Sequence, residues 1–291
     1  MKKNTARFMI LNTTLQTTLQ TTSQWMLRIA LASLVGSTLI MAGCQTVTTA
    51  PSGTAKDPEQ AARTRTAIAA EYIKKGDLDT AKRHLEQALT ADPRSAEANN
   101  MMGILLQQEG SPINVKRAED YYKRAISLKE DFAQAHNNYG VYLSSNKRYA
   151  DAMKQFEVAG STLGYDGRAS ALENLGRTAL MINDNVRAQS AFEQATNTDR
   201  NLAVSHFELA ELYLDQGKVS MASARYNQYL KLVGGQPKAA RALWVGMRLA
   251  RLQQNGERLQ ELADQLQRVY PDSDEYKRYL MIRQTPGAAW K

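Results

Sequence analysis

Cysteine is almost absent from this chain, and that absence excludes several classes of protein. Cys44 is the only cysteine among 291 residues, so no intramolecular disulfide and no paired-cysteine zinc or redox motif is possible. The three histidines form no His-Glu-x-x-His motif, and no glycine-rich loop leads into Gly-Lys-Ser/Thr. The sequence therefore predicts a protein that is not an enzyme and that uses no metal ion, cofactor or small-molecule substrate.

Clustered charge of one sign is also lacking. The formal net charge is +8, but four basic residues and no acidic ones precede Cys44, so the rest of the chain carries only +4. The remaining charges alternate in sign, as where Glu119 and Asp120 stand beside Lys123 and Arg124. A nucleic-acid binder would show a clustered basic face. The sequence therefore predicts no nucleic-acid partner.

A long apolar run is missing as well. The uncharged stretch from Ile29 to Gly43 follows Arg28. It is shorter than the roughly 20 apolar residues of a membrane-spanning helix, and it is typical of the central region of a secretory signal peptide. The alternative is a buried apolar segment that happens to contain a cysteine.

The apolar run ends in Met41-Ala42-Gly43-Cys44, which resembles the lipobox of bacterial lipoproteins with Met in place of the usual Leu. The resemblance implies that Cys44 is lipidated and becomes the first residue of the mature chain. We therefore predict a lipoprotein signal peptide over 1–43, with Met26 as an alternative start, and a flexible tether rich in Thr, Ala, Pro, Ser and Gly over 44–60.

Proline is scarce, Ala and Leu are plentiful, and one pattern recurs five times, which together predict an all-α fold. The pattern places a large–small–large set on one helix and a small–large–small set on the next, as in tetratricopeptide repeats. The small residue of the second helix is Ala81, Ala118, Ala152, Ala188 and Ala222, at steps of 37, 34, 36 and 34 residues. Extra residues at 110–114 and 160–167 account for the two longer steps.

The repeats predict an all-α tetratricopeptide superhelix of about six helix-turn-helix units that follows the signal peptide and tether. Repeats one to five occupy 61–236, a degenerate sixth repeat with a C-terminal cap occupies 237–283, and 284–291 form a tail that we expect to be mobile. His136 and His206 fall at the same position of two repeats, so we predict structural roles for them.

The first helix of each repeat should present a strip of residues to a concave groove. This groove strip is almost uncharged, and its amide and aliphatic groups suit an extended peptide or a helix. The Lys and Asn clamp by which chaperone-binding repeats hold a peptide carboxylate is absent at the matching positions. The candidate partner-binding residues of the groove strip are Ala70, Ile73, Asn100, Ile104, Gln107, Asn137 and Val141.

Three stretches resemble one family: Ala91-Asp92-Pro93, the segment 136–140 (His-Asn-Asn-Tyr-Gly) and the segment 242–250 (Ala-Leu-Trp-Val-Gly-Met-Arg-Leu-Ala). Together with the lipobox, the tether and the repeats, they make the chain similar to the PilF/PilW type IV pilus biogenesis lipoproteins, which act as pilotins. The resemblance implies a non-enzymatic outer-membrane lipoprotein that faces the periplasm. Its partners would be secretin subunits, which it helps to localise and to multimerise. Gln45 after the cysteine agrees with an outer-membrane address.

Two other interpretations stay open at the level of sequence. The chain could be a general periplasmic adaptor that docks peptidoglycan hydrolases or proteases. It could also be an enzyme with chemistry in the degenerate sixth unit, although that unit contains no His, no Cys and no clustered carboxylates.

Overall fold

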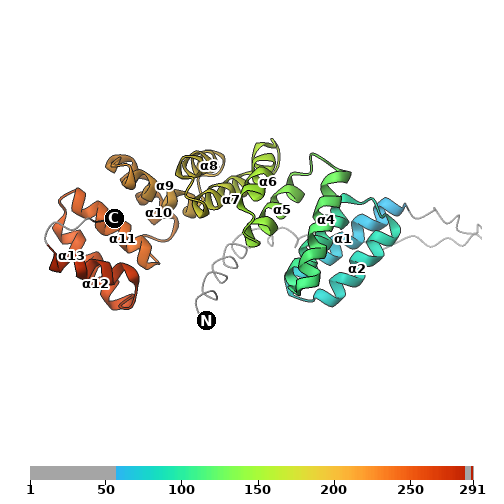
Figure 1. Cartoon of the computed structure of the whole chain (residues 1–291), viewed down its shortest axis with the longest axis horizontal. Helices are drawn as coiled ribbons and strands as arrows, with labels where there is room; N and C mark the ends of the chain where they lie inside the picture. Colours follow the sequence, from blue (N-terminus) through green and yellow to red (C-terminus); the bar gives the residue numbers. More distant parts are fainter. Residues whose placement is uncertain (1–56, 286–289, 291) are drawn as a thin grey trace, which may run out of the picture. The chain divides into compact units, whose positions relative to one another are not determined.

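The computed structural model describes residues 57–285 and 290, and within them every regular element is an α-helix. Figure 1 shows these helices running in chain order. Their bounds are α1 Pro58–Lys75, α2 Leu78–Ala91, α3 Ala96–Glu109, α4 Pro112–Leu128, α5 Ala133–Ser145, α6 Tyr149–Ser161, α7 Arg168–Met181, α8 Asn185–Thr198, α9 Ala203–Asp215, α10 Val219–Leu232, α11 Ala240–Leu252, α12 Gly256–Val269 and α13 Asp274–Gln284. The predicted signal peptide, Cys44 and most of the predicted tether lie outside the described residues.

The helices form six consecutive hairpins, α1/α2 to α11/α12, and each hairpin packs on the next. The odd-numbered helices contact one another from α1 to α11, and each even-numbered helix contacts the first helix of the following hairpin. The six predicted repeats and the all-α class are thereby confirmed. The first helix begins at Pro58, three residues before the predicted start of the repeats.

Polar side chains at several helix starts explain where the helices begin. The hydroxyls of Ser95 and Ser111 accept hydrogen bonds from the backbone N–H groups of Ala98 and Asn114, each at 3.2 Å. Such caps satisfy N–H groups that have no partner within the helix. α3 and α4 therefore start where the sequence places a capping serine, whereas α5, α6, α7, α9, α10 and α11 begin without a side-chain cap.

In repeats two, three and four a glycine of the first helix faces an aromatic ring of the second helix. A Cβ atom added to Gly140 would lie 2.6 Å from a ring carbon of Phe156, and one added to Gly176 would lie 2.7 Å from Phe192. These distances are below van der Waals contact, so the side chain must be absent for the helices to pack this closely. In the first repeat, where Ala69 stands at this position, the matching residue is Leu85 instead of an aromatic ring, and both are buried.

Neighbouring hairpins are joined by tyrosine hydroxyls that reach back to the preceding repeat. Tyr139 donates to Glu119 at 2.8 Å, and Arg148 donates to the same carboxylate at 2.7 Å. Partial burial alone would raise the pKa of Glu119, but hydrogen bonds from Lys123, Arg148 and Tyr139 outweigh it and lower the pKa to about 2. These bonds hold one repeat against the next.

The last hairpin differs from the others because its first helix is buried on all sides. Every residue of α11 from Ala242 to Ala250 is buried, since α9, α10, α12 and α13 all pack against this helix. The Trp290 ring stacks on Trp244 with centroids 5.3 Å apart, and the Arg251 guanidinium lies 4.9 Å from the centre of Trp290. Trp290 therefore packs on the last hairpin through aromatic and cation–π contacts, and the mobility of the tail stays a prediction.

Within residues 57–285 and 290, every helix is too short or too polar to cross a membrane.

The contact between Gly140 and Phe156 predicts a coupled pair of substitutions. Gly140→Ala should lower the free energy of unfolding by about 1–3 kcal/mol, because the new methyl group overpacks the hairpin. Phe156→Leu should cost about 1–2 kcal/mol through lost burial. The double variant recreates the Ala69 and Leu85 pair of the first repeat, so it should lose less than the sum of the two costs. Urea unfolding of all four proteins measures the coupling, and simple additivity would contradict this account.

Candidate partner-binding site

The groove strip lies on the first helices of repeats one to three, and the structure gives its members unequal exposure. Val141 is 38% exposed, whereas Ile73 and Asn100 are only 8% and 2% exposed. Ala70, Ile104, Gln107 and Asn137 are partly buried. Ile73 and Asn100 therefore belong to the packing between helices, and the other five residues form the accessible part of the strip.

The amide groups of the groove strip make contacts between repeats and, at Gln107, within one repeat. Asn138 donates to the Asn100 side-chain oxygen at 3.1 Å, and Asn174 donates to that of Asn137 at 3.2 Å. The Gln107 side-chain oxygen accepts from the Tyr122 hydroxyl at 2.8 Å. These amides are therefore already held in place by hydrogen bonds. Sequence analysis missed Asn138 and Asn174, although each lies about one repeat from its partner.

The same face becomes charged in repeats four to six. The Arg241 guanidinium donates to both oxygens of Glu208, at 2.9 and 2.7 Å, and it also forms an ion pair with Glu211. It lies 4.9 Å from the centre of the Phe207 ring. Burial raises the pKa of Glu211, and the pKa of Glu173 rises for the same reason. Ion pairs therefore join the first helices of repeats five and six, and hydrogen bonds from Ser205 to Glu173 join those of repeats four and five.

The histidines play the structural part predicted for them. His136 bonds the backbone oxygen of Glu130 at 2.9 Å, and His206 bonds that of Arg200 at 3.1 Å. The two rings thus stabilise equivalent turns, which precede the first helices of repeats three and five. Among residues 57–285 and 290, no group of three or more His, Cys, Asp or Glu side chains could hold a metal ion.

Two cavities that sequence analysis did not predict lie on the side of the second helices. The larger, of about 480 Å³, lies between α6, α7 and α8, and the smaller, of about 280 Å³, is lined by α2, α3 and α4. Neither contains a residue of the groove strip. Both lie where successive repeats are spaced by more than 34 residues. The steps of 37 and 36 residues between equivalent alanines were therefore the feature of the sequence that could have indicated these cavities.

The stacked hairpins define this chain as a tetratricopeptide-repeat protein, a class whose members typically serve as non-catalytic modules for protein interactions. Residues 62–95 and 114–162 each match the tetratricopeptide-repeat family. The type IV pilus assembly protein PilF of Pseudomonas aeruginosa is 31% identical over 208 residues, which cover 72% of this chain and 80% of that protein.

Two solved structures are also similar. That of Pseudomonas aeruginosa PilF has 28% identity and a TM-score of 0.70, covering 78% of this chain and 99% of the other. That of PilW, a widely conserved type IV pilus biogenesis factor, has 25% identity and a TM-score of 0.61, covering 76% and 99%. The chain belongs to the PilF/PilW family of type IV pilus biogenesis proteins.

The ion-pair cluster predicts a pH-dependent loss of stability. Arg241→Ala should lower the free energy of unfolding by about 2 kcal/mol at pH 7, because it leaves the Glu208 and Glu211 carboxylates close together without their cation. Arg241 lowers the pKa of Glu211, so its removal raises that pKa in the folded state, and the loss of stability should shrink as the pH falls and Glu211 becomes protonated. Urea unfolding between pH 4 and pH 8 measures it.

Arg63→Ala serves as the control, because its ion pair with Glu59 is exposed on both sides and should contribute less than about 0.5 kcal/mol. Equal losses for the two variants, or a loss at Arg241 that does not change with pH, would contradict the role assigned to the cluster.

Proposed function

We propose that this protein is an outer-membrane lipoprotein that binds secretin subunits of the type IV pilus and promotes their localisation and multimerisation. Membership of the PilF/PilW family carries the proposal, because it links the chain to pilus biogenesis. The lipobox that ends at Cys44 supports attachment to the outer membrane, and the uncharged groove strip supports a polypeptide partner. The protein would act through binding alone and not as an enzyme.

The groove strip suits a segment of an unassembled subunit. Ile104 and Val141 offer aliphatic surface, while Gln107 and Asn137 are held beside them by hydrogen bonds from Tyr122 and Asn174. Apolar groups flanked by fixed amides can receive alternate side chains of an extended strand or one face of a helix. Because the strip belongs to packed helices, it would lose little conformational entropy when a partner binds.

The lipid anchor would keep this surface near the site of channel assembly. Each buried methylene contributes about 0.8 kcal/mol to membrane binding, so three acyl chains on Cys44 would make the anchor effectively permanent. The predicted tether would then let the repeats search the space below the membrane.

A general periplasmic adaptor for peptidoglycan hydrolases or proteases is the alternative. A pull-down that returns such enzymes in place of a secretin would favour it.

The anchor is tested by substitution at two neighbouring positions. Cys44→Ser should release the protein from the outer-membrane fraction, because no acyl chain can then be attached. Gln45→Asp keeps the cysteine and should shift the protein to the inner membrane. Fractionation with immunoblotting measures both, and a Cys44→Ser protein that stays with the outer membrane would disprove the anchor.

The groove strip is tested by placing a charge on its exposed part. Val141→Asp combined with Ile104→Asp should weaken binding to secretin subunits at least tenfold and reduce the heat-sensitive multimer on unheated gels, because a carboxylate would be desolvated against an apolar partner. Val158→Asp is the matched control, since Val158 on α6 is 39% exposed and lies outside the strip. Normal multimers in the double variant, or equal loss in the control, would rule the strip out.

A further inference from the structure

The C-terminal end of the stack has a hydrophobic core of its own. Some side chains of α11 belong to the main core of the repeats, but others form a separate cluster with α12 and with Tyr279 of α13. The members of this C-terminal core on α11 and α12 are Leu243, Trp244, Met247, Leu262, Ala263 and Leu266. Each of them is at most 2% exposed. Because this core is separate, it can open without disturbing the rest of the stack.

The helix that covers the C-terminal core, α13, makes few buried contacts of its own. It is the shortest of the described helices, with 11 residues, and Tyr279 is its only buried residue. Within the described part of the chain it packs on α11 and α12 alone. A helix of this length is marginal in water without tertiary contacts. Its stability therefore depends on its seat, which we define as the surface of α11 and α12 that α13 covers.

Trp290 joins α13 to this seat. Its ring stacks on Trp244 of α11, with centroids 5.3 Å apart and planes 4° from parallel. It also meets the ring of Tyr279 on α13 at 6.1 Å and an angle of 65°. The Arg251 guanidinium of α11 lies 4.9 Å from its centre. Stacked and edge-on rings attract one another, and a cation attracts a ring face, so one side chain links the helix to the surface that it covers.

The burial of Trp244 opposes this closed arrangement. Its indole N–H is buried and has no hydrogen-bond partner. An indole nitrogen can only donate, and a buried donor without an acceptor loses the hydrogen bond that water would otherwise provide. Exposure of Trp244 would restore that bond. The free-energy difference between the closed and open states is therefore smaller than the ring contacts alone would give.

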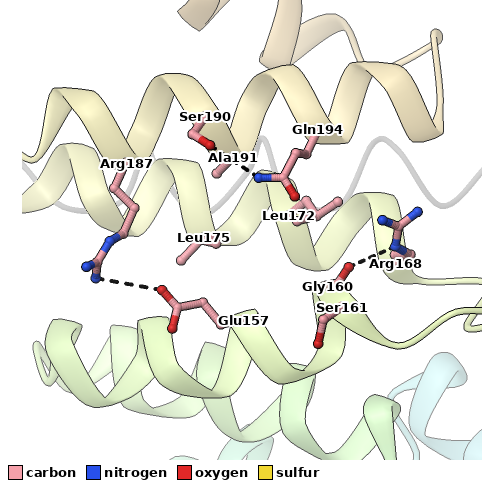
Figure 2. A pocket seen from close by; sticks show the side chains of 10 residues that line it. All are labelled: Glu157, Gly160, Ser161, Arg168, Leu172, Leu175, Arg187, Ser190, Ala191 and Gln194. Carbon is pink, nitrogen blue, oxygen red and sulfur yellow. Dashed lines mark hydrogen bonds and ion pairs between the residues drawn. The ribbon is translucent and has the colours of Figure 1, made fainter.

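The seat of α13 differs from the cavity between α6, α7 and α8. Figure 2 shows Glu157 and Arg187 facing one another there, with Leu172 and Leu175 on α7, so charged groups of that cavity already pair. The seat is apolar, and an apolar seat can receive one face of a helix. The apolar side chains that α13 places against it are Tyr276, Tyr279 and Ile282. The present occupant thus shows which chemistry fits the seat.

We propose that Trp290 is a latch that keeps α13 on its seat, and that the seat is a helix-docking site which becomes available when Trp290 leaves it. The occupant of the closed site is α13 of the same chain. In the open state the seat accepts a helix that presents the same two tyrosines and isoleucine on one face. The site belongs to the last hairpin and shares no residue with the groove strip, so the inference does not depend on a secretin being the partner of that strip.

Hydrogen exchange of the full chain in detergent tests the latch. Trp290→Ala should speed the exchange of the α13 amides at least tenfold and leave that of α1 to α10 unchanged. Trp290→Phe should have a smaller effect, because a ring that can stack remains. Val269→Ala is the matched control, since Val269 at the end of α12 is 55% exposed and does not belong to the C-terminal core. In that variant the exchange of α13 should stay within twofold of the unchanged protein.

A peptide tests the seat. The probe is a fluorescent, amidated peptide of residues 273–285, and its binding is measured by anisotropy. It should bind the Trp290→Ala protein at least tenfold more tightly than the unchanged protein, because the apparent affinity rises with the fraction of open seats. The same peptide with Tyr279→Ala should bind at least tenfold more weakly. Unchanged exchange of α13 in Trp290→Ala, faster exchange spread over all helices, or a peptide that binds both proteins equally would each overturn the proposal.

Discussion

The structure depends on the close approach of two helices within each repeat, made possible by a residue without a bulky side chain. At Gly140 and Gly176 even a methyl group would overlap the ring that faces it. The ring then fills the space between one hairpin and the next, so a single small residue permits both the closure of a hairpin and its stacking on a neighbour. In repeats two and three this contact positions the first helices that carry the groove strip.

Stacking also determines how the face of the first helices is divided. In repeats two to four, neighbouring first helices are joined by neutral amide pairs, such as Asn100 with Asn138. In repeats five and six they are joined by ions, with Arg241 between Glu208 and Glu211. Neutral pairs leave a surface on which an apolar segment can be desolvated at low cost, whereas the charged half would resist it. A polypeptide that binds through apolar groups is therefore favoured in the first half.

Much of the fold could be predicted from local pattern, and less of the site. The spacing of Ala81, Ala118 and their equivalents was enough to place five hairpins, because each of them needs the same small residue at the same point, and the sixth was predicted as a degenerate repeat. The groove strip was predicted from position alone, and it did not distinguish Val141, which is exposed, from Asn100, which is covered. The cavity over Leu172 and Leu175 was not predicted, although the irregular repeat spacing marks its location.

The sequence by itself determined the all-α class, the number of repeats, the order of the hairpins and the family, since these follow from residue type and spacing along one helix pair. The tertiary structure alone decided which residues are accessible. Asn100 is buried by a helix one repeat away, and α11 is enclosed by helices on several sides and by Trp290. Burial depends on neighbours that are distant in the chain, and a pattern with a period of one helical turn carries no information about them.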